Sequence, residues 1–241
     1  MLHNYVRFIK AIPFLGSILV FMGRKILGAP QSVVFENSAK YWQDRYQSGG
    51  TSGAGAYGRL AAFKADTLNS FVDDNRIQNV VEYGCGDGAQ LSLATYPSYT
   101  GFDVSPLAVA MCREKFAPQT EKYRFFHTSE VLDEEGYFDL AISLDVIYHL
   151  VEDDVFDAYM RRLFNSSKRF VIIYAYNFDK SYESKHERGR EFLKWCKIYV
   201  KEWRLEMVVK NPYAFDPRDP DQTSQSDFFF FRKCAHGQRQ I

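Results

Sequence analysis

The residues best suited to ligand chemistry lie in one short stretch, N-V-V-E-Y-G-C-G-D-G, at positions 79–88. An apolar run ends in the carboxylate of Glu82, and three glycines follow at alternate positions. Glycine allows a sharp turn and a close approach of backbone to a ligand, and the amide groups at a helix start attract negative or electron-rich groups. Because Ala89–Thr95 is compatible with a helix, the order strand, glycine turn, helix predicts a nucleotide-type cofactor site. The glycines are Gly84, Gly86 and Gly88.

Short strands alternate with helices after this turn. Ser105 and Pro106 provide an N-cap and a first helical position, and a further helix is expected over Asp153–Phe164. Such alternation predicts a doubly wound, Rossmann-like α/β fold with a mostly parallel sheet and right-handed crossovers. The expected strands are Tyr99–Asp103, Tyr123–His127, Phe138–Leu144 and Arg169–Tyr176.

The C-terminal part departs from this alternation. We expect one helix over Glu187–Trp203, then a strand, then a last strand that contains the four consecutive phenylalanines Phe228–Phe231. A fully apolar run indicates a strand that is buried on both faces, so the last strand is expected inside the sheet. Two successive strands joined by a loop pair most simply as antiparallel neighbours.

Two helices and a glycine-rich loop are expected before the turn. Ser38 is the expected N-cap of a short helix, and the next helix should turn Leu60, Phe63 and Leu68 inward. The loop between them reads Q-S-G-G-T-S-G-A-G-A-Y-G. Its composition fits either a clamp over the cofactor site or a flexible linker between the helices.

Composition limits the classes of function. The chain has 241 residues, and its 30 basic and 30 acidic residues give no net charge. A neutral chain argues against a broad nucleic-acid surface, which needs excess lysine and arginine. The cysteines, Cys85, Cys112, Cys196 and Cys234, form no C-x-x-C pair, so we expect reduced thiols in a cytoplasmic protein. No histidines and carboxylates have metal-ligand spacing along the sequence, so no metal is expected.

Residues 1–35 are expected to form a basic, amphipathic segment ahead of the main domain at residues 36–241. No acidic residue occurs up to Val34, and the apolar run between the basic residues is shorter than the roughly 20 residues that span a bilayer. The pattern favours a helix that lies on an anionic membrane surface through residues 1–28. The alternatives are docking on the protein itself or on a partner subunit, and a signal peptide. The basic residues are Arg7, Lys10, Arg24 and Lys25.

Two cofactors fit the glycine turn. Gly84, Gly86 and Ala89 satisfy the dinucleotide pattern G-x-G-x-x-G/A, and Asp103 follows Gly84 by nineteen positions, so NAD is one alternative. Three features favour S-adenosylmethionine. Glu82 would repel a pyrophosphate but attract an amino group, helices precede the first strand, and the sheet ends in a hairpin in place of a second nucleotide-binding half.

Three motifs together resemble the class I S-adenosylmethionine-dependent methyltransferases: V-V-E-Y-G-C-G-D-G, G-F-D-V-S and F-D-L-A-I-S-L-D-V-I-Y-H-L. The resemblance covers Tyr41–Lys233 and implies a seven-stranded sheet in the order 3-2-1-4-5-7-6, with one antiparallel strand near the C-terminus. More narrowly, Y-W-Q-D-R-Y, S-G-A-G-A-Y-G-R-L and D-P-R-D-P are similar to a bacterial subgroup encoded among glycan-assembly genes.

The resemblance implies roles for the residues around the turn. Glu82 would orient the methionine amino group, the glycines would pack against the methionine and ribose portions, and Thr128 stands where an adenine contact is expected. Asp103 would accept hydrogen bonds from both ribose hydroxyls, the alternative being a helix cap ahead of Ser105. The implied cofactor contacts are Glu82, Gly84, Cys85, Gly86, Asp87, Gly88, Asp103, Val104, Thr128 and Asp145.

Methyl transfer to a hydroxyl needs alignment and a proton acceptor. Asp145 is expected beside the transferable methyl group, and otherwise caps a helix. His149, four residues on, shares the face of Asp145 if a helix begins there, and His186 is the second catalytic candidate. Each histidine has a plainer alternative, as a packed or solvent-facing side chain. Acceptor contacts are expected from Tyr57, Arg59, Tyr148, Arg188 and Arg190.

The predicted function is therefore transfer of a methyl group from S-adenosylmethionine to an oxygen or nitrogen of a small or glycan-type acceptor, in surface-polysaccharide biosynthesis. The expected place is the cytoplasm or the cytoplasmic face of the inner membrane, with no nucleic-acid partner. The alternatives are an NAD-dependent oxidoreductase, a non-catalytic binding protein that keeps the fold, and a methyltransferase acting on RNA or protein.

Overall fold

The computed structural model describes residues 35–130, 137–181 and 184–234. Apart from Phe35, the predicted basic segment lies outside these residues, so its interpretation as a membrane-surface helix stays a prediction. Within the described ranges, no helix is both long enough and apolar enough to cross a membrane.

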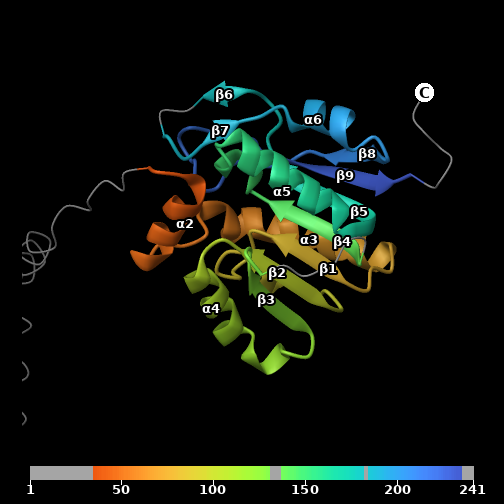
Figure 1. Ribbon diagram of the computed structural model, residues 1–241, viewed down its shortest axis with the longest axis horizontal. Coiled ribbons are helices and arrows are strands. Elements are labelled where there is room, and N and C mark those ends of the chain that lie inside the picture. The colour runs from red at the N-terminus through yellow and green to blue at the C-terminus, as the bar shows by residue number, and fades with distance from the viewer. Residues whose placement is uncertain (1–34, 131–136, 182–183, 235–241) are drawn as a thin grey trace, which may run out of the picture. The chain divides into compact units, whose positions relative to one another are not determined.

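A seven-stranded sheet forms the centre of the domain, in the order β3-β2-β1-β4-β5-β9-β8 (Figure 1). Strands β1 to β5 are parallel to their neighbours in this group, whereas β9 is antiparallel to both β5 and β8. The strands are β1 (Val80–Tyr83), β2 (Tyr99–Asp103), β3 (Tyr123–His127), β4 (Phe138–Leu144), β5 (Ser167–Ala175), β8 (Trp203–Val209) and β9 (Asp227–Lys233). The Rossmann-like fold class is confirmed.

A two-stranded hairpin of β6 (Lys180–Ser181) and β7 (Arg188–Gly189) lies apart from the main sheet. The sequence did not predict this hairpin, and it shifts the numbering of the last two strands. With β6 and β7 set aside, β8 and β9 are the sixth and seventh strands of the main sheet, in the places expected for them.

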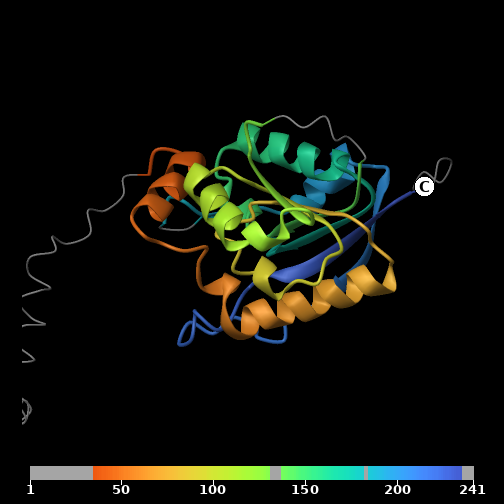
Figure 2. The same ribbon diagram turned by 90° about the horizontal axis from the view of Figure 1, so that it is seen from below.

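Helices cover both faces of the sheet. Helices α3 and α4 contribute to the apolar cluster on one face, and α5 and α6 to the cluster on the other. Figure 2 shows α3 and α5 on opposite sides of the sheet. The helices are α2 (Ser38–Gln47), α3 (Gly58–Asp74), α4 (Pro106–Lys115), α5 (Asp153–Asn165) and α6 (Phe192–Tyr199), with 3₁₀ turns η2 (Ala54–Ala56), η3 (Leu91–Leu93), η4 (Ala117–Gln119) and η5 (Ile147–His149).

The phenylalanine run forms most of β9 and is buried on both faces. Phe228 and Phe230 join the cluster that includes α3, and Phe229 and Phe231 join the cluster that includes α5. This alternation is the period-two geometry of a strand, and β9 lies between β5 and β8. The prediction of an inserted, doubly covered strand is confirmed.

Two local expectations before and after β1 were wrong. Ala89–Thr95 contains only the short turn η3, and the carboxylate of Asp87 caps this segment by accepting a hydrogen bond from the Ala89 amide at 3.0 Å. The N-cap of α2 is Asn37, whose side chain accepts from the Lys40 amide at 2.8 Å. Ser38 lies inside the first turn and donates to Glu152 through both its amide and its hydroxyl.

The expected helix over Glu187–Trp203 is a strand followed by a shorter helix. Residues of β7 pair with β6, and α6 begins only at Phe192. Arg190 explains part of this departure, because its guanidinium donates to the carbonyls of Leu150 and Val151 and to Asp153. These contacts tie the segment to the end of β4 and the start of α5, and they compete with a local helix.

The buried face of β9 should contribute strongly to stability. Phe230→Ala removes a ring from the core and should lower the free energy of unfolding by about 3–5 kcal/mol. Met207→Ala alters its strand neighbour in the β8–β9 ladder, but Met207 is 44% exposed, so the loss should stay below about 1 kcal/mol. Urea unfolding checks both, and equal losses would contradict the buried position of β9.

Candidate active site

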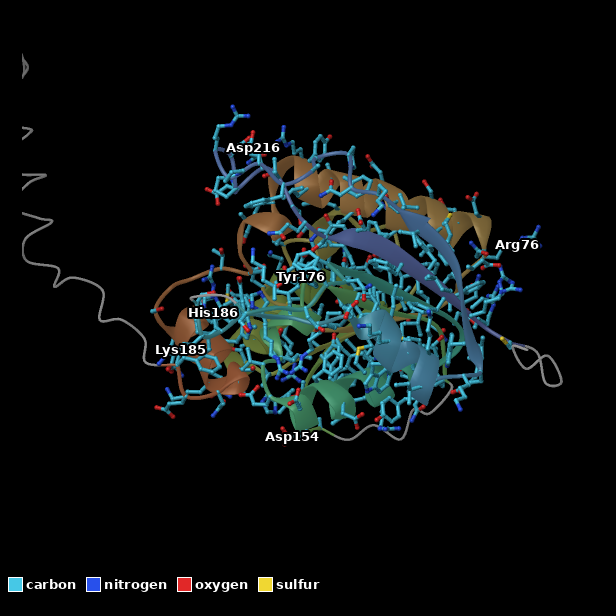
Figure 3. All side chains as sticks on the ribbon, turned by 90° about the horizontal axis from the view of Figure 1, so that it is seen from above. Arg76, Asp154, Tyr176, Lys185, His186 and Asp216 are labelled. Carbon is cyan, nitrogen blue, oxygen red and sulfur yellow. The ribbon has the colours of Figure 1, made fainter. Side chains whose placement is uncertain are left out.

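A cavity of about 700 Å³ opens where β1, β2 and β4 end. Its wall includes the last residues of these strands, the glycine turn after β1, and residues of α2, the glycine-rich loop and the loop before β9. Parallel strands end at one edge of a sheet, and in open α/β sheets the crevice at that edge is the usual ligand site. In Figure 3, the labelled Tyr176 and His186, both part of this wall, lie on one side of the molecule.

The turn after β1 is shaped to leave backbone exposed to the cavity. Gly84 and Gly86 have φ of 87° and 57°, values that side chains rarely adopt, and a Cβ at Gly84 would collide with Val146. Both glycines line the cavity. Gly88 does not, because it packs closely against Phe116 and Cys112 of the α4 region. Gly88 therefore packs against the α4 region, and its expected cofactor contact stays a prediction.

Glu82 lies at the floor of the cavity and is almost fully buried. The Tyr99 hydroxyl donates to its Oε2 at 2.6 Å. Burial raises the pKa of Glu82 to about 7, an effect that the Tyr99 hydrogen bond and the nearby Lys64 oppose. The carboxyl group can therefore gain or lose a proton near neutral pH when a charged ligand enters.

Asp103 ends β2 and also faces the cavity. Its Oδ2 accepts from the Gly86 amide at 2.9 Å, and its Oδ1 accepts from the Ser105 amide at 2.8 Å. Burial raises the pKa of Asp103, and these amide contacts oppose that shift. The helix cap of α4 is Ser105, whose hydroxyl accepts from the Ala108 amide. Asp103 thus braces the glycine turn and is not itself the cap.

Asp87 holds the glycine-rich loop in place. Its Oδ2 accepts from the Ser52 amide at 3.1 Å and from the Tyr57 hydroxyl at 2.8 Å, and the Asp87 amide donates to the Ser52 hydroxyl at 3.0 Å. Residues 52–56 of the loop line the cavity, whereas Asp87 does not. The loop therefore packs against the glycine turn as a wall of the cavity, as expected of a clamp.

Asp145 follows β4 and adopts a φ of 59°, which is rare for a residue with a side chain. Its Oδ2 accepts from Lys64 Nζ at 2.8 Å, and its Oδ1 accepts from the hydroxyls of Tyr148 at 3.1 Å and Ser226 at 3.2 Å. The predicted alternative, a helix cap, is not observed, because η5 has no side-chain cap. Four elements thus position this carboxylate in the cavity wall.

Lys64 is the most informative residue that the sequence interpretation missed. Its side chain is 2% exposed, and its ammonium lies 5.2 Å from the centre of the Tyr174 ring. A lysine in an amphipathic helix is normally expected to face solvent, so helical periodicity alone could not reveal that Lys64 is buried. The signal available was its position four residues after Leu60, on the apolar face of α3.

His149 and His186 come together although 37 positions separate them. His149 Nδ1 lies 3.2 Å from the His186 carbonyl oxygen, and the two rings are nearly parallel at an angle of 11°. Tyr41 of α2 stacks on His186 with ring centres 4.1 Å apart, and Trp42 meets His149 edge-on. Burial lowers the pKa of His149 to about 4, so its ring is neutral near pH 7. No helix joins Asp145 and His149, which lies in the 3₁₀ turn η5.

The remaining predicted contacts divide into two groups. Cys85, Val104, Thr128 and Tyr148 line the cavity. The second group lies outside the cavity wall, and its side chains form hydrogen bonds between loops. It consists of Tyr57, Arg59, Arg188 and Arg190.

Arg59 and Arg188 are both held by contacts within the protein. Arg59 donates to the Gln222 carbonyl and to Asp219 and lies over the Tyr213 ring. Arg188 donates to Asp153, the residue that Arg190 also contacts. The guanidinium groups of Arg59 and Arg188 thus have internal partners outside the cavity wall, and their expected acceptor contacts stay predictions.

Comparisons with known proteins agree with the fold and the cofactor-type site described above. Residues 56–218 match the family model described as "Methyltransferase domain", more than half of the chain. Magnesium protoporphyrin IX methyltransferase (ChlM) from Synechocystis PCC 6803 with bound SAM superposes with a TM-score of 0.58, at 15% identity, over 82% of this chain and 97% of that chain. A search of curated proteins gives no significant match.

Two further solved structures share the fold. An S-adenosylmethionine-dependent methyltransferase from Clostridium acetobutylicum ATCC 824 has a TM-score of 0.53 at 14% identity, over 71% of this chain and 91% of that chain. The methyltransferase domain of bacterial CtHen1-C has a TM-score of 0.53 at 21% identity, over 71% and 97%. The chain therefore belongs to the methyltransferase-domain family and has the fold of the class I S-adenosylmethionine-dependent methyltransferases.

Proposed function

We propose that this protein transfers the methyl group of S-adenosylmethionine to an oxygen or nitrogen of a small or glycan-type acceptor. The observation that carries the proposal is the convergence of Glu82, Asp103 and Asp145 on one cavity, which Gly84 and Gly86 also line. Family membership supports the same reaction class.

The residues around the glycine turn fit this cofactor. Gly84 and Gly86 line the cavity without a side chain, and we propose that Asp103 accepts hydrogen bonds from the ribose hydroxyls and that Glu82 pairs with the methionine amino group. When bound, S-adenosylmethionine supplies an electrophilic methyl group whose bond to sulfur breaks as the acceptor atom bonds to the carbon. A pyrophosphate would meet these carboxylates at a cost, because like charges repel, and this disfavours the NAD alternative.

The acceptor side of the cavity is mainly aromatic. Tyr41, Trp42, Tyr148, Tyr176 and Phe215 contribute to its wall. Aromatic faces of this kind pack well against sugar rings and other flat or apolar groups. Asp145 lines the same cavity, and we propose that His149 and His186 are the groups that help an acceptor hydroxyl lose its proton. The similarity of three sequence motifs to the bacterial subgroup encoded among glycan-assembly genes supports a glycan-type acceptor.

Asp103→Ala should weaken cofactor binding. Loss of hydrogen bonds to a charged acceptor costs about 1.5–3 kcal/mol, which is roughly a 10- to 100-fold rise in Kd. Titration calorimetry with S-adenosylhomocysteine measures this change. Asp73→Ala, at an exposed position near the end of α3, is the matched control and should leave Kd unaltered.

The same calorimeter separates the two cofactor classes. Binding of S-adenosylmethionine without binding of NADH is expected for the wild-type chain. Heat from NADH alone would reverse the proposed function, and an unaltered Kd in Asp103→Ala would remove Asp103 from the cofactor site.

Glu82 should make cofactor binding depend on pH. Its pKa of about 7 in the folded protein lies above the ordinary value of 4.5, so between these values the folded chain holds a proton that the unfolded chain has lost. This contribution to stability is present at low pH and is lost as pH rises through about 7. An incoming amino group favours the ionised carboxylate, so binding near pH 7 should release up to about half a proton from Glu82.

The released protons can be counted by calorimetry at pH 7 in two buffers with different ionisation enthalpies. Glu82→Gln should release fewer protons than wild type on binding S-adenosylhomocysteine. Glu121→Gln, an exposed substitution after η4, should match wild type. Equal release by all three proteins would show that Glu82 does not meet the amino group.

We also propose that residues 1–28 bring the enzyme to an anionic membrane surface at the cytoplasmic face, near a lipid-linked glycan precursor. The support is in the sequence, where Arg7, Lys10, Arg24 and Lys25 flank an apolar run. Flotation with anionic liposomes should recover the full chain and lose the chain that lacks residues 1–35. Equal recovery of both would exclude this segment as the membrane contact.

A further inference from the structure

Three potential metal ligands meet on the acceptor side of the cavity. His149, His186 and Glu187 each offer one ligand atom, and the three atoms lie within 4.8 Å of one another. In the parts of the chain that the structure describes, no other group of three such residues meets this criterion. All three residues line the cavity, so an ion bound there would face its interior.

The surroundings of His149 are those of a metal-binding histidine. Its Nδ1 lies against the His186 carbonyl oxygen at 3.2 Å. When that nitrogen carries the proton and donates to the carbonyl, Nε2 keeps its lone pair for a ligand. Metal-bound histidines in proteins almost always have their second nitrogen held in this way, because the contact sets both the tautomer and the orientation of the ring.

His186 is oriented by stacking and by its neighbour. The Tyr41 ring covers one face of its imidazole at an interplanar angle of 10°, and a Glu187 carboxylate oxygen lies 3.7 Å from Nε2. Ligand atoms bound at about 2.0–2.2 Å around a tetrahedral ion lie roughly 3.3 Å apart. The three atoms, which lie within 4.8 Å of one another, would therefore have to move closer together when an ion binds.

The charges around His149, His186 and Glu187 are compatible with a bound cation. Glu187 supplies a negative charge beside two imidazoles. Arg45, which also lines the cavity, is an opposing charge, but its guanidinium donates to the Thr51 carbonyl at 2.7 Å and lies 5.5 Å from the centre of the Trp42 ring. Two histidines and one carboxylate form a ligand set that leaves coordination positions free for water or substrate.

We propose that His149, His186 and Glu187 bind a divalent first-row transition-metal ion, of which Zn²⁺ is the best match to the ligand set. This inference rests on the proposed function for its role, because the ion would sit where the acceptor enters. A divalent cation lowers the pKa of a hydroxyl that it binds. With their nitrogens on the ion, His149 and His186 would therefore act on the acceptor through the metal and not as direct proton acceptors, and the acceptor oxygen would lose its proton to solvent before the methyl group is transferred. The proposed site departs from the expectation, drawn from sequence spacing, of no metal.

The test is metal binding by the full chain, prepared without an affinity tag and freed of metal by chelation. Titration with Co²⁺, followed by visible absorption, and with Zn²⁺, followed by calorimetry, should give one ion per chain. His149→Phe and His186→Phe keep the ring packing but remove the nitrogens, and each should weaken binding by at least roughly 100-fold. His127→Phe is the matched control, since the His127 nitrogens contact Val104 and Ser129 instead, and it should bind like wild type.

Circular dichroism and the Kd for S-adenosylhomocysteine, measured on the same samples, report on folding and on the cofactor site separately. Weakened metal binding with unaltered cofactor binding would support the site. Absence of saturable binding, or equal affinity in wild type and both histidine variants, would overturn it. If the wild-type chain binds the ion but no cofactor, the proposed function fails while the metal site stands.

Discussion

Carboxylates gathered at one edge of a sheet must each have a partner, because a buried charge without one is costly. The strands β1, β2 and β4 end side by side, so Glu82, Asp103 and Asp145 reach the same cavity. Each is compensated differently: the Tyr99 hydroxyl contacts the first, backbone amides contact the second, and the Lys64 ammonium pairs with the third. This balance of charge determines which further groups the cavity can accept.

The ion pair between Asp145 and Lys64 links the site to the segment that precedes β1. Lys64 belongs to α3, and α3 directly follows the glycine-rich loop that Asp87 holds against the glycine turn. Gly55 of that loop leaves room for Asp145, since a Cβ there would stand about 3.0 Å from Oδ2. The loop, the ion pair and the turn therefore form one network, and the residues before β1 are part of the site and not merely a lead-in to the sheet.

Much of the sheet could be predicted from the sequence because its signals are local. The strands β2, β3 and β4 match the expected ranges, and alternating burial of the β9 phenylalanines follows from strand geometry alone. The placement of Glu82 and Asp103 also follows, since both end parallel strands. Lys64 could not be foreseen as a partner of Asp145, because a helical pattern shows which face a residue lies on but not which charge it meets across 81 positions.

His149, His186 and Tyr148 were each expected at the site, but their meeting in one cluster could not be predicted, for a different physical reason. The residues of the acceptor side come from α2, from η5 and from the segment before β7, which have no shared periodicity. Arg190 ties the segment after β7 to the residues between η5 and α5, and near it His186 meets His149 and Tyr41. The proposed cofactor contacts thus lie at strand ends, which sequence patterns reveal, whereas the proposed acceptor contacts depend on long-range side-chain contacts. For this reason the reaction class can be inferred from the chain more directly than the molecule that receives the methyl group.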